Sequence, residues 1–353
     1  MDSLGMIMPV NVHGHFRDIG PLMDFIVPFT AREFQIGQAM PNTQSPILTG
    51  DDAVAYRLAI LEVAKKAGYP NFDVMTSIKL THKTKPATIL DARKKDVRSF
   101  KIYIKGTTTN SDDGIDVDRF WELGDVFSAA QDCEMICSGH CEIARTGDHV
   151  VSRFDRERRA QTLVIQLARE FPDLRIVVEH VSTADMVRTV ERLPKNVGAS
   201  ITPHHLTCTV HDLMDHRLHP DYFCQPVLQE FSDQRELIRV ATSGHPKFFY
   251  GGDDALHLAS KKYCPDCCSG IFNAPVAVPL MIQLFEKHNA LAKLDDFMRQ
   301  NALRFYGLGA GSDAKICYRK ESWKVPERLD VPGTGDYVVP FLAGRTLQWQ
   351  AGC

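Results

Sequence analysis

The sequence predicts an α/β protein built as a (β/α)8 barrel of the TIM type. Short apolar runs alternate with longer amphipathic segments, and there are eight such runs in the 353 residues. A strand followed by a helix, repeated along the chain, favours a parallel sheet. Eight repeats within roughly 250 residues favour a closed barrel over an open sheet.

The expected strands are the eight short apolar runs. They cover residues 7–13, 34–39, 74–80, 100–104, 134–139, 175–180, 199–202 and 248–252. Amphipathic patterns between them predict helices. These helices cover residues 51–67, 117–130, 155–171, 183–193 and 234–243, and two more follow the last strand at 274–287 and 294–305.

We expect one domain over residues 1–353. The segment 309–353 contains Pro326, Pro332 and Pro340 and ends in a short apolar stretch at 338–349. We expect this C-terminal segment to pack back on the barrel.

Composition excludes several classes of partner. A net charge of -3 gives no basic excess for a nucleic-acid backbone. The apolar run at 6–12 is interrupted by Pro9 and is too short for a signal peptide or a membrane span. We therefore expect a cytoplasmic protein that binds neither nucleic acid nor membranes.

The cysteines form one tight cluster, at Cys264, Cys267 and Cys268. A lone CxxC pair supplies half of a structural zinc site. The sequence offers no second half, so a loop with free thiols is favoured over a metal.

Titratable residues gather at the expected C-terminal ends of the strands, where the loops of such a barrel form its mouth. The spacing of His13 and His15 places both rings on one face of the first strand. The other strand ends carry Lys101, His140, His180 and Asp253. Taken singly, the lysine would be an exposed, solvated side chain and each histidine a residue whose hydrogen bonds are satisfied. The aspartate alone would be a helix N-cap. Together they would leave unpaired donors and a buried cation at the mouth unless metal ions bind them.

The set predicts a binuclear metal site. His13, His15 and Asp253 can hold one divalent ion, and His140 with His180 the second. Two cations need a bridging anion to offset their repulsion. A buried lysine has a lowered pKa, and its neutral amine can add CO₂, so Lys101 could become a bridging carbamate.

The motifs that carry a family resemblance extend over nearly the whole chain. They are His13-Gly14-His15-Phe16-Arg17-Asp18, Met40-Pro41-Asn42-Thr43, Lys101-Ile102-Tyr103, Thr107-Thr108-Thr109-Asn110-Ser111, Glu179-His180, Ile201-Thr202-Pro203-His204-His205-Leu206, Gly252-Asp253, His257, Phe272-Asn273-Ala274-Pro275 and Val339-Pro340-Phe341-Leu342-Ala343-Gly344. In this order they resemble the dihydroorotase family, single-domain bacterial type, of the amidohydrolase superfamily.

The resemblance implies the reversible cyclisation of N-carbamoyl-L-aspartate to dihydroorotate in pyrimidine synthesis, with two Zn²⁺ ions and a homodimer. It implies that His13, His15, carboxylated Lys101 and Asp253 hold one zinc, and that Lys101, His140 and His180 hold the other. Asp253 would also be the catalytic base and acid. The remaining roles concern the substrate: Arg17, Asn42 and His257 for its carboxylate, Thr108 and Thr109 on a closing loop, and main-chain groups near Cys224, Gln225 and Ser269 for the ring.

Some positions depart from the family pattern or have another interpretation. Gly14, Phe16, Cys141, Gln225 and Glu230 stand where other residue types are expected. From composition alone, residues 107–114 would equally be a flexible loop.

Two other functions stay open. One is a cyclic amide hydrolase of the hydantoinase or allantoinase kind, whose substrates lack the ring carboxylate that Arg17 would bind. The other is a catalytically dead homologue that serves as a scaffold.

Overall fold

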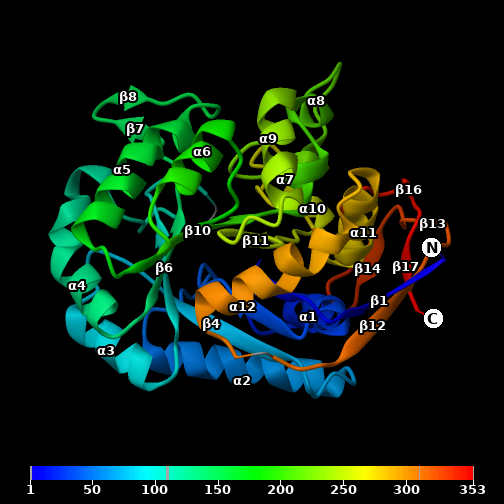
Figure 1. Ribbon diagram of the computed structural model, residues 1–353, viewed down its shortest axis with the longest axis horizontal. Helices are drawn as coiled ribbons and strands as arrows, with labels where there is room; N and C mark the ends of the chain where they lie inside the picture. Colours follow the sequence, from blue (N-terminus) through cyan, green and yellow to red (C-terminus); the bar gives the residue numbers. More distant parts are fainter. Residues whose placement is uncertain (1, 109–110, 310, 353) are drawn as a thin grey trace.

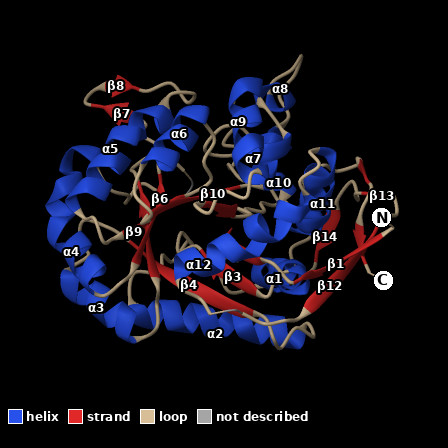
Figure 2. Ribbon diagram, viewed as in Figure 1, coloured by secondary structure: helices blue, strands red, loops and turns tan. Residues whose placement is uncertain are grey.

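Eight parallel strands form a nearly closed barrel inside a ring of helices (Figures 1 and 2). The computed structural model describes residues 2–108, 111–309 and 311–352. The strands follow one another around the barrel in chain order. They are β2 (Val10–Gly14), β3 (Ile36–Ala39), β4 (Asp73–Lys79), β5 (Ser99–Tyr103), β6 (Ile136–His140), β9 (Arg175–Val178), β10 (Val197–Ile201) and β11 (Phe248–Tyr250). The predicted barrel is confirmed, and its strand ends differ from the predicted ones by a few residues.

The first and last barrel strands meet through a short seam. The backbone N–H of Asp253 donates to the carbonyl of His13 at 2.8 Å, and that of His15 donates to the carbonyl of Asp254 at 3.1 Å. The side chain of Asn11 accepts from the N–H of Gly252 at 2.8 Å. Barrel closure therefore depends on the segments that carry three of the predicted metal ligands.

The helices around the barrel include all those that were predicted. They are α2 (Gly50–Lys66), η1 (Val117–Leu123) with α4 (Gly124–Asp132), α5 (Arg156–Glu170), α6 (Ala184–Arg192), α9 (Phe231–Thr242), α11 (Ala277–Lys287), and η5 (Asp296–Gln300) with α12 (Asn301–Tyr306). Helix α2 begins at a capping box, in which the side chain and N–H of Thr49 bond Asp52. The predicted helix 117–130 begins as a 3₁₀ segment, and the one predicted at 294–305 begins as a π-helical turn.

Two helices of the ring were missed from the sequence. α1 (Pro21–Glu33) contains Pro28 and is apolar on most sides, and α3 (Pro86–Lys94) buries only Ile89 and Ala92. Neither shows a clear amphipathic period. The shorter helices are α7 (Pro203–Thr207), α8 (Val210–Leu213), η2 (Pro220–Tyr222), α10 (Ala259–Lys262), η3 (Ala274–Val276) and η4 (Leu291–Lys293).

The two ends of the chain lie together beside the barrel (Figure 1). β1 (Ser3–Ile7) pairs antiparallel with β12 (Lys315–Arg319), which also pairs with β17 (Gln350–Ala351). The remaining short strands form three hairpin-like pairs: β7 (Arg145–Thr146) with β8 (His149–Val150), β13 (Trp323–Lys324) with β16 (Thr346–Leu347), and β14 (Leu329–Val331) with β15 (Asp336–Val338).

The C-terminal segment contacts the barrel through Phe341, whose N–H donates to the carbonyl of Phe272 at 2.7 Å. Trp349 and Leu347 are buried against the core. Among the residues described here, no helix has the length and apolar character needed to cross a bilayer.

Candidate metal centre and substrate pocket

Three of the predicted ligands converge where the barrel closes. His13 and His15 stand at the end of β2, and Asp253 follows β11. The Nε2 atoms of His15 and His13 lie 3.0 and 3.4 Å from Asp253 Oδ1. Their ligand atoms all lie within 4.8 Å of one another. The arrangement gives two nitrogens and one oxygen around one point, a set that suits zinc.

The hydrogen bonding of His13 also points to a cation. Its Nδ1 lies 2.9 Å from Glu179 Oε2. A carboxylate only accepts hydrogen bonds, so Nδ1 carries a proton. Nε2 lies 3.4 Å from Asp253 Oδ1, and a divalent cation that binds the lone pairs of both atoms would fit between the two side chains.

The second pair of predicted ligands lies across the barrel. His140 at the end of β6 and His180 after β9 place Nδ1 and Nε2 3.0 Å apart. His140 Nε2 bonds Glu142 Oε2 at 2.8 Å, so its Nδ1 is the nitrogen left to bind a metal. Burial, together with the neighbouring His140, holds the pKa of His180 well below its ordinary value. The neutral ring that results is the form a metal needs.

Lys101 lies in the barrel wall on β5, and its Nζ lies 5.5 Å from the centre of the Tyr103 ring. Its side chain is fully buried, and Nζ has no hydrogen-bond partner among the described residues. Burial lowers the pKa of Lys101. An isolated buried ammonium is costly, so the site suits a lysine that is neutral or carries an acidic modification.

Burial and neighbouring side chains also shift the pKa values of two other predicted ligands, His15 and Asp253. Burial lowers the pKa of His15 to about 4. Burial raises the pKa of Asp253, but the His13 and His15 rings more than offset this and hold it below the ordinary value. Asp253 is therefore ionised at neutral pH and can accept a proton.

Three predicted site residues have left-handed backbone conformations. Their φ angles are 66° at Arg17, 43° at His180 and 48° at Asp253. Non-glycine residues rarely adopt this region, and each such residue costs about 1 kcal/mol or more. The fold maintains these conformations at the positions where side chains must turn into the barrel mouth.

A pocket at the mouth collects most of the predicted site residues. It is lined by His13, His15, Arg17, Asn42, Tyr103, Thr108, His140, His180, Gln225, Asp253, Ala255, His257, Ser269 and Gly270. Lys101 and Cys224 lie beneath its surface, and Thr109 falls outside the described residues.

Arg17 is the positive group of this pocket. Its Nε and Nη2 atoms are buried, and within the described part of the chain neither has a hydrogen-bond partner. Burial lowers its pKa, which shows how strongly the site desolvates it. His257 lies nearby with Nε2 3.0 Å from the carbonyl of Ser269. A desolvated guanidinium with two available donors fits a carboxylate.

The loop predicted as a lid is described at Thr107, Thr108 and Ser111, while residues 109 and 110 lie outside the described residues. The Ser111 hydroxyl donates to the carbonyl of Thr108 at 2.6 Å and accepts from its N–H at 3.1 Å. The Thr107 hydroxyl donates to the carbonyl of Ile104 at 2.6 Å. These bonds hold Thr107 to Ile104 and Thr108 to Ser111, and Thr108 lines the pocket.

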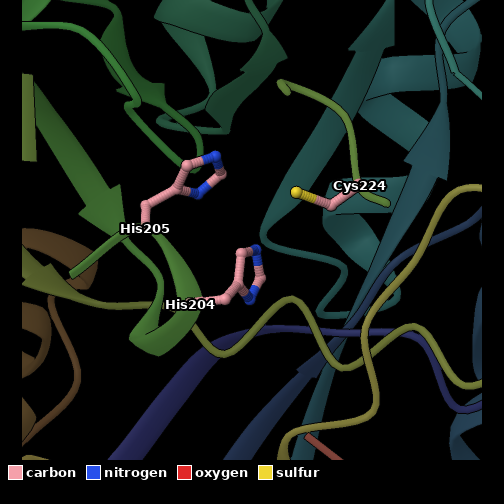
Figure 3. Close-up of side chains that lie close together, drawn as sticks. All are labelled: His204, His205 and Cys224. Atoms are coloured by element: carbon pink, nitrogen blue, oxygen red, sulfur yellow. The ribbon is translucent and has the colours of Figure 1, made fainter. Parts of the chain in front are cut away.

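A second group of potential ligands lies deeper (Figure 3). His204 and His205 from α7 point toward Cys224, and all three are buried. Both ring nitrogens of His205 are already bonded, to Thr202 Oγ1 at 2.8 Å and to the Pro226 carbonyl at 3.0 Å. This saturation indicates a structural cluster that holds the loop of Cys224 and Gln225 against the pocket.

The CxxC cluster gives no sign of a metal. Cys264, Cys267 and Cys268 are free thiols. Within 2–108, 111–309 and 311–352, no group of three potential metal ligands includes them. The loop interpretation is the one that this arrangement favours.

Sequence reasoning did not single out Glu142, Glu179, Tyr103 or Asn11. Glu142 could have been found, because it follows His140 at the same two-residue spacing as the His13 pair. Tyr103, whose buried hydroxyl lines the pocket, has the same spacing from Lys101. Glu179 stands beside His180 in a quoted motif but received no role, because strand alternation places neighbouring side chains on opposite faces. The φ angle at His180 is 43°, so regular alternation does not hold at this point.

Two of the known proteins similar to this chain are dihydroorotases. A dihydroorotase from Marinomonas sp. is 37% identical over 351 residues, covering 99% of each chain. The crystal structure of a dihydroorotase from Saccharomyces cerevisiae in complex with 5-fluoroorotic acid superposes with a TM-score of 0.91 at 27% identity, covering 100% of this chain and 99% of the yeast chain.

Other comparisons are less specific. An L-hydantoinase from Arthrobacter aurescens superposes with a TM-score of 0.78, but at 17% identity it shares the fold alone. The superposition covers 99% of this chain and 83% of the hydantoinase chain. A scan against models of protein families finds no match.

Proposed function

Because the chain belongs to the dihydroorotase family, we propose that it catalyses the reversible, metal-dependent cyclisation of N-carbamoyl-L-aspartate to (S)-dihydroorotate and water. This is the ring-closing step of de novo pyrimidine (UMP) biosynthesis. The observation that carries the proposal is the buried Arg17 guanidinium, with two unpartnered nitrogens, in the same pocket as the predicted metal ligands.

The metal ions belong to the two groups of ligands at the barrel mouth. His13, His15 and Asp253 would hold one Zn²⁺, and His140 with His180 the other. Bound divalent metals would polarise the amide carbonyl and lower the pKa of water near it. His13 Nε2 and Asp253 Oδ1 lie 3.4 Å apart with His15 Nε2 beside them, and this group of three donor atoms supports the proposed ion.

Lys101 would link the two ions as a carbamate formed from CO₂. Its buried, unpartnered Nζ supports this role. Carboxylation replaces a positive charge by a negative one, so it removes the cost of a buried ammonium and supplies the bridging anion.

The substrate would lie with its carboxylate on Arg17, supported by Asn42 and His257. A guanidinium forks onto a carboxylate with two parallel hydrogen bonds. Thr108, and Thr109 next to it, would cover the bound ring. The main chain near Cys224, Gln225 and Ser269 would contact the ring edge.

Asp253 would carry the proton. In the hydrolytic direction its ionised carboxylate accepts a proton from the attacking water and delivers it to the departing ring nitrogen. The His13 and His15 rings keep it ionised and hold it at the reacting point.

The rival activity is hydrolysis of a neutral cyclic amide, as in hydantoinases. Such substrates have no carboxylate and would leave the Arg17 guanidinium desolvated and unpaired, which is unfavourable. A catalytically dead homologue is disfavoured because all six predicted ligands are present in the sequence.

One experiment tests the proposal. Purified, zinc-loaded protein is assayed with dihydroorotate, hydantoin and allantoin, and its metal content is measured. We expect two ions per chain and turnover of dihydroorotate above the other two substrates. Preference for hydantoin would support the rival activity, and bound metal with no turnover of any substrate would support the scaffold. A homodimer in the cytoplasm remains our prediction, and sedimentation tests the dimer.

A further inference from the structure

One histidine in each group of predicted ligands is held from behind by a buried glutamate. These are His13, bonded to Glu179, and His140, bonded to Glu142. In both cases the bonded nitrogen is the one that faces away from the other ligands. The two glutamates have no assigned role in the proposed function, so the pairing requires its own explanation.

The first pair spans the barrel. Glu179 follows β9, and its Oε2 accepts from His13 Nδ1 at 2.9 Å and from the Ser200 hydroxyl at 2.6 Å. The Ser200 oxygen in turn accepts the backbone N–H of His180 at 2.8 Å. The side chain of Glu179 is almost completely buried.

The second pair is local. Glu142 stands two residues after His140, and its Oε2 accepts from His140 Nε2 at 2.8 Å. Both side chains are almost completely buried. The bond fixes the ring in the orientation that directs Nδ1 toward His180.

The two contacts select opposite ring nitrogens. His13 is protonated on Nδ1 and presents Nε2, whereas His140 is protonated on Nε2 and presents Nδ1. A histidine ring without a partner on its far nitrogen can change tautomer and rotate, and either change removes the lone pair from the metal.

We propose that Glu179 and Glu142 are positioning residues, each responsible for the affinity of one metal ion through the histidine that it orients. This inference rests on the two-metal centre of the proposed function. Glu179 serves the ion at His13, and Glu142 serves the ion at His140.

The test compares Glu179→Gln and Glu142→Gln with Glu157→Gln. Glu157 is the matched control, because it is also buried but bonds the backbone N–H groups of Ser182 and Thr183 at 2.8 and 2.7 Å, near the same strand end. Zn²⁺ affinity is measured by competition with a chelator. Each of the first two variants should lower the affinity for one of the two ions about tenfold to a hundredfold and leave the affinity for the other nearly unchanged. The control should keep both.

The metal site whose affinity falls is identified with ¹¹³Cd-loaded protein, which gives one NMR signal per ion. His15→Ala and His180→Ala, each lacking one ligand, assign the two signals. Glu179→Gln should then disturb the signal that His15→Ala removes, and Glu142→Gln the signal that His180→Ala removes. Thermal unfolding shows whether each variant is folded.

A measurement without mutations covers the case in which a variant does not fold. Long-range ¹H–¹⁵N spectra of the zinc-loaded wild type report the tautomer of each ring. We expect a proton on Nδ1 of His13 and on Nε2 of His140. The same tautomer on both rings, or unchanged metal affinity in both glutamine variants, would overturn the inference while leaving the metal centre in place. A wild type that binds no metal would instead overturn the metal centre itself.

Discussion

Replacing Arg17 tests the identity of the substrate. Arg17→Met keeps roughly the volume of the side chain but removes its charge, and Arg17→Lys keeps the charge but not the fork. Arg17 is not a predicted ligand, so both variants should retain their metal. Activity should therefore respond through the substrate carboxylate alone.

The size of the expected loss in kcat/KM follows from the two Arg17 nitrogens without a hydrogen-bond partner, Nε and Nη2. A hydrogen bond to a charged group is worth about 1.5–3 kcal/mol, and a fork supplies two. Arg17→Met should then lower kcat/KM for dihydroorotate by about 10²–10⁴, with Arg17→Lys between it and wild type.

The assay is the steady-state hydrolysis of dihydroorotate, with hydantoin as the neutral substrate and metal content measured on each preparation. Any turnover of hydantoin should change little in either variant. Arg119→Met is the control, because it removes an exposed arginine that pairs with Glu122 on the surface. Equal losses on both substrates, or no loss on dihydroorotate, would show that Arg17 does not bind the carboxylate.

Three further predictions concern the centre and its surroundings. Lys101→Ala should fold but lose activity because the ions lose their bridge, and a short carboxylic acid should partly restore turnover; full activity without it would exclude the bridge. Asp253→Asn should keep much of its metal, yet its kcat should fall by several orders of magnitude because an amide cannot carry the proton; a kcat within about threefold of wild type would place the base elsewhere. Burial raises the pKa of Glu157 from 4.5 to about 7, so its protonated form stabilises the fold below pH 4.5 and this contribution is lost as the pH rises to 7. Urea unfolding should show wild type losing about 3 kcal/mol relative to Glu157→Gln across that range, and parallel pH profiles would contradict the assignment.

The sequence predicted the barrel because its strands are mostly buried and form short apolar runs. Helix α1 escaped because it is buried on most sides and contains Pro28, so no amphipathic period marks it. The 3₁₀ start of the segment at 117 could not be foreseen, since the two helix types share nearly the same apolar spacing.

The predicted ligands could be located because each ends a strand, and strand ends meet at one face of a barrel. The residues behind them are harder to predict. Glu179 bonds His13 from 166 residues away in sequence, and no local pattern specifies a contact of that separation.

The seam between the first and last strands has a consequence for the biogenesis of the enzyme. His15 and Asp253 are 238 residues apart in sequence, so a ribosome has made most of the chain before they can meet. Contacts of such long separation form late, because a large loop must close first. The nascent chain therefore cannot complete the His13, His15 and Asp253 site until the eighth strand has been synthesised and the barrel has closed. Chains truncated before residue 253 would lack Asp253 and could not assemble this group of three predicted ligands.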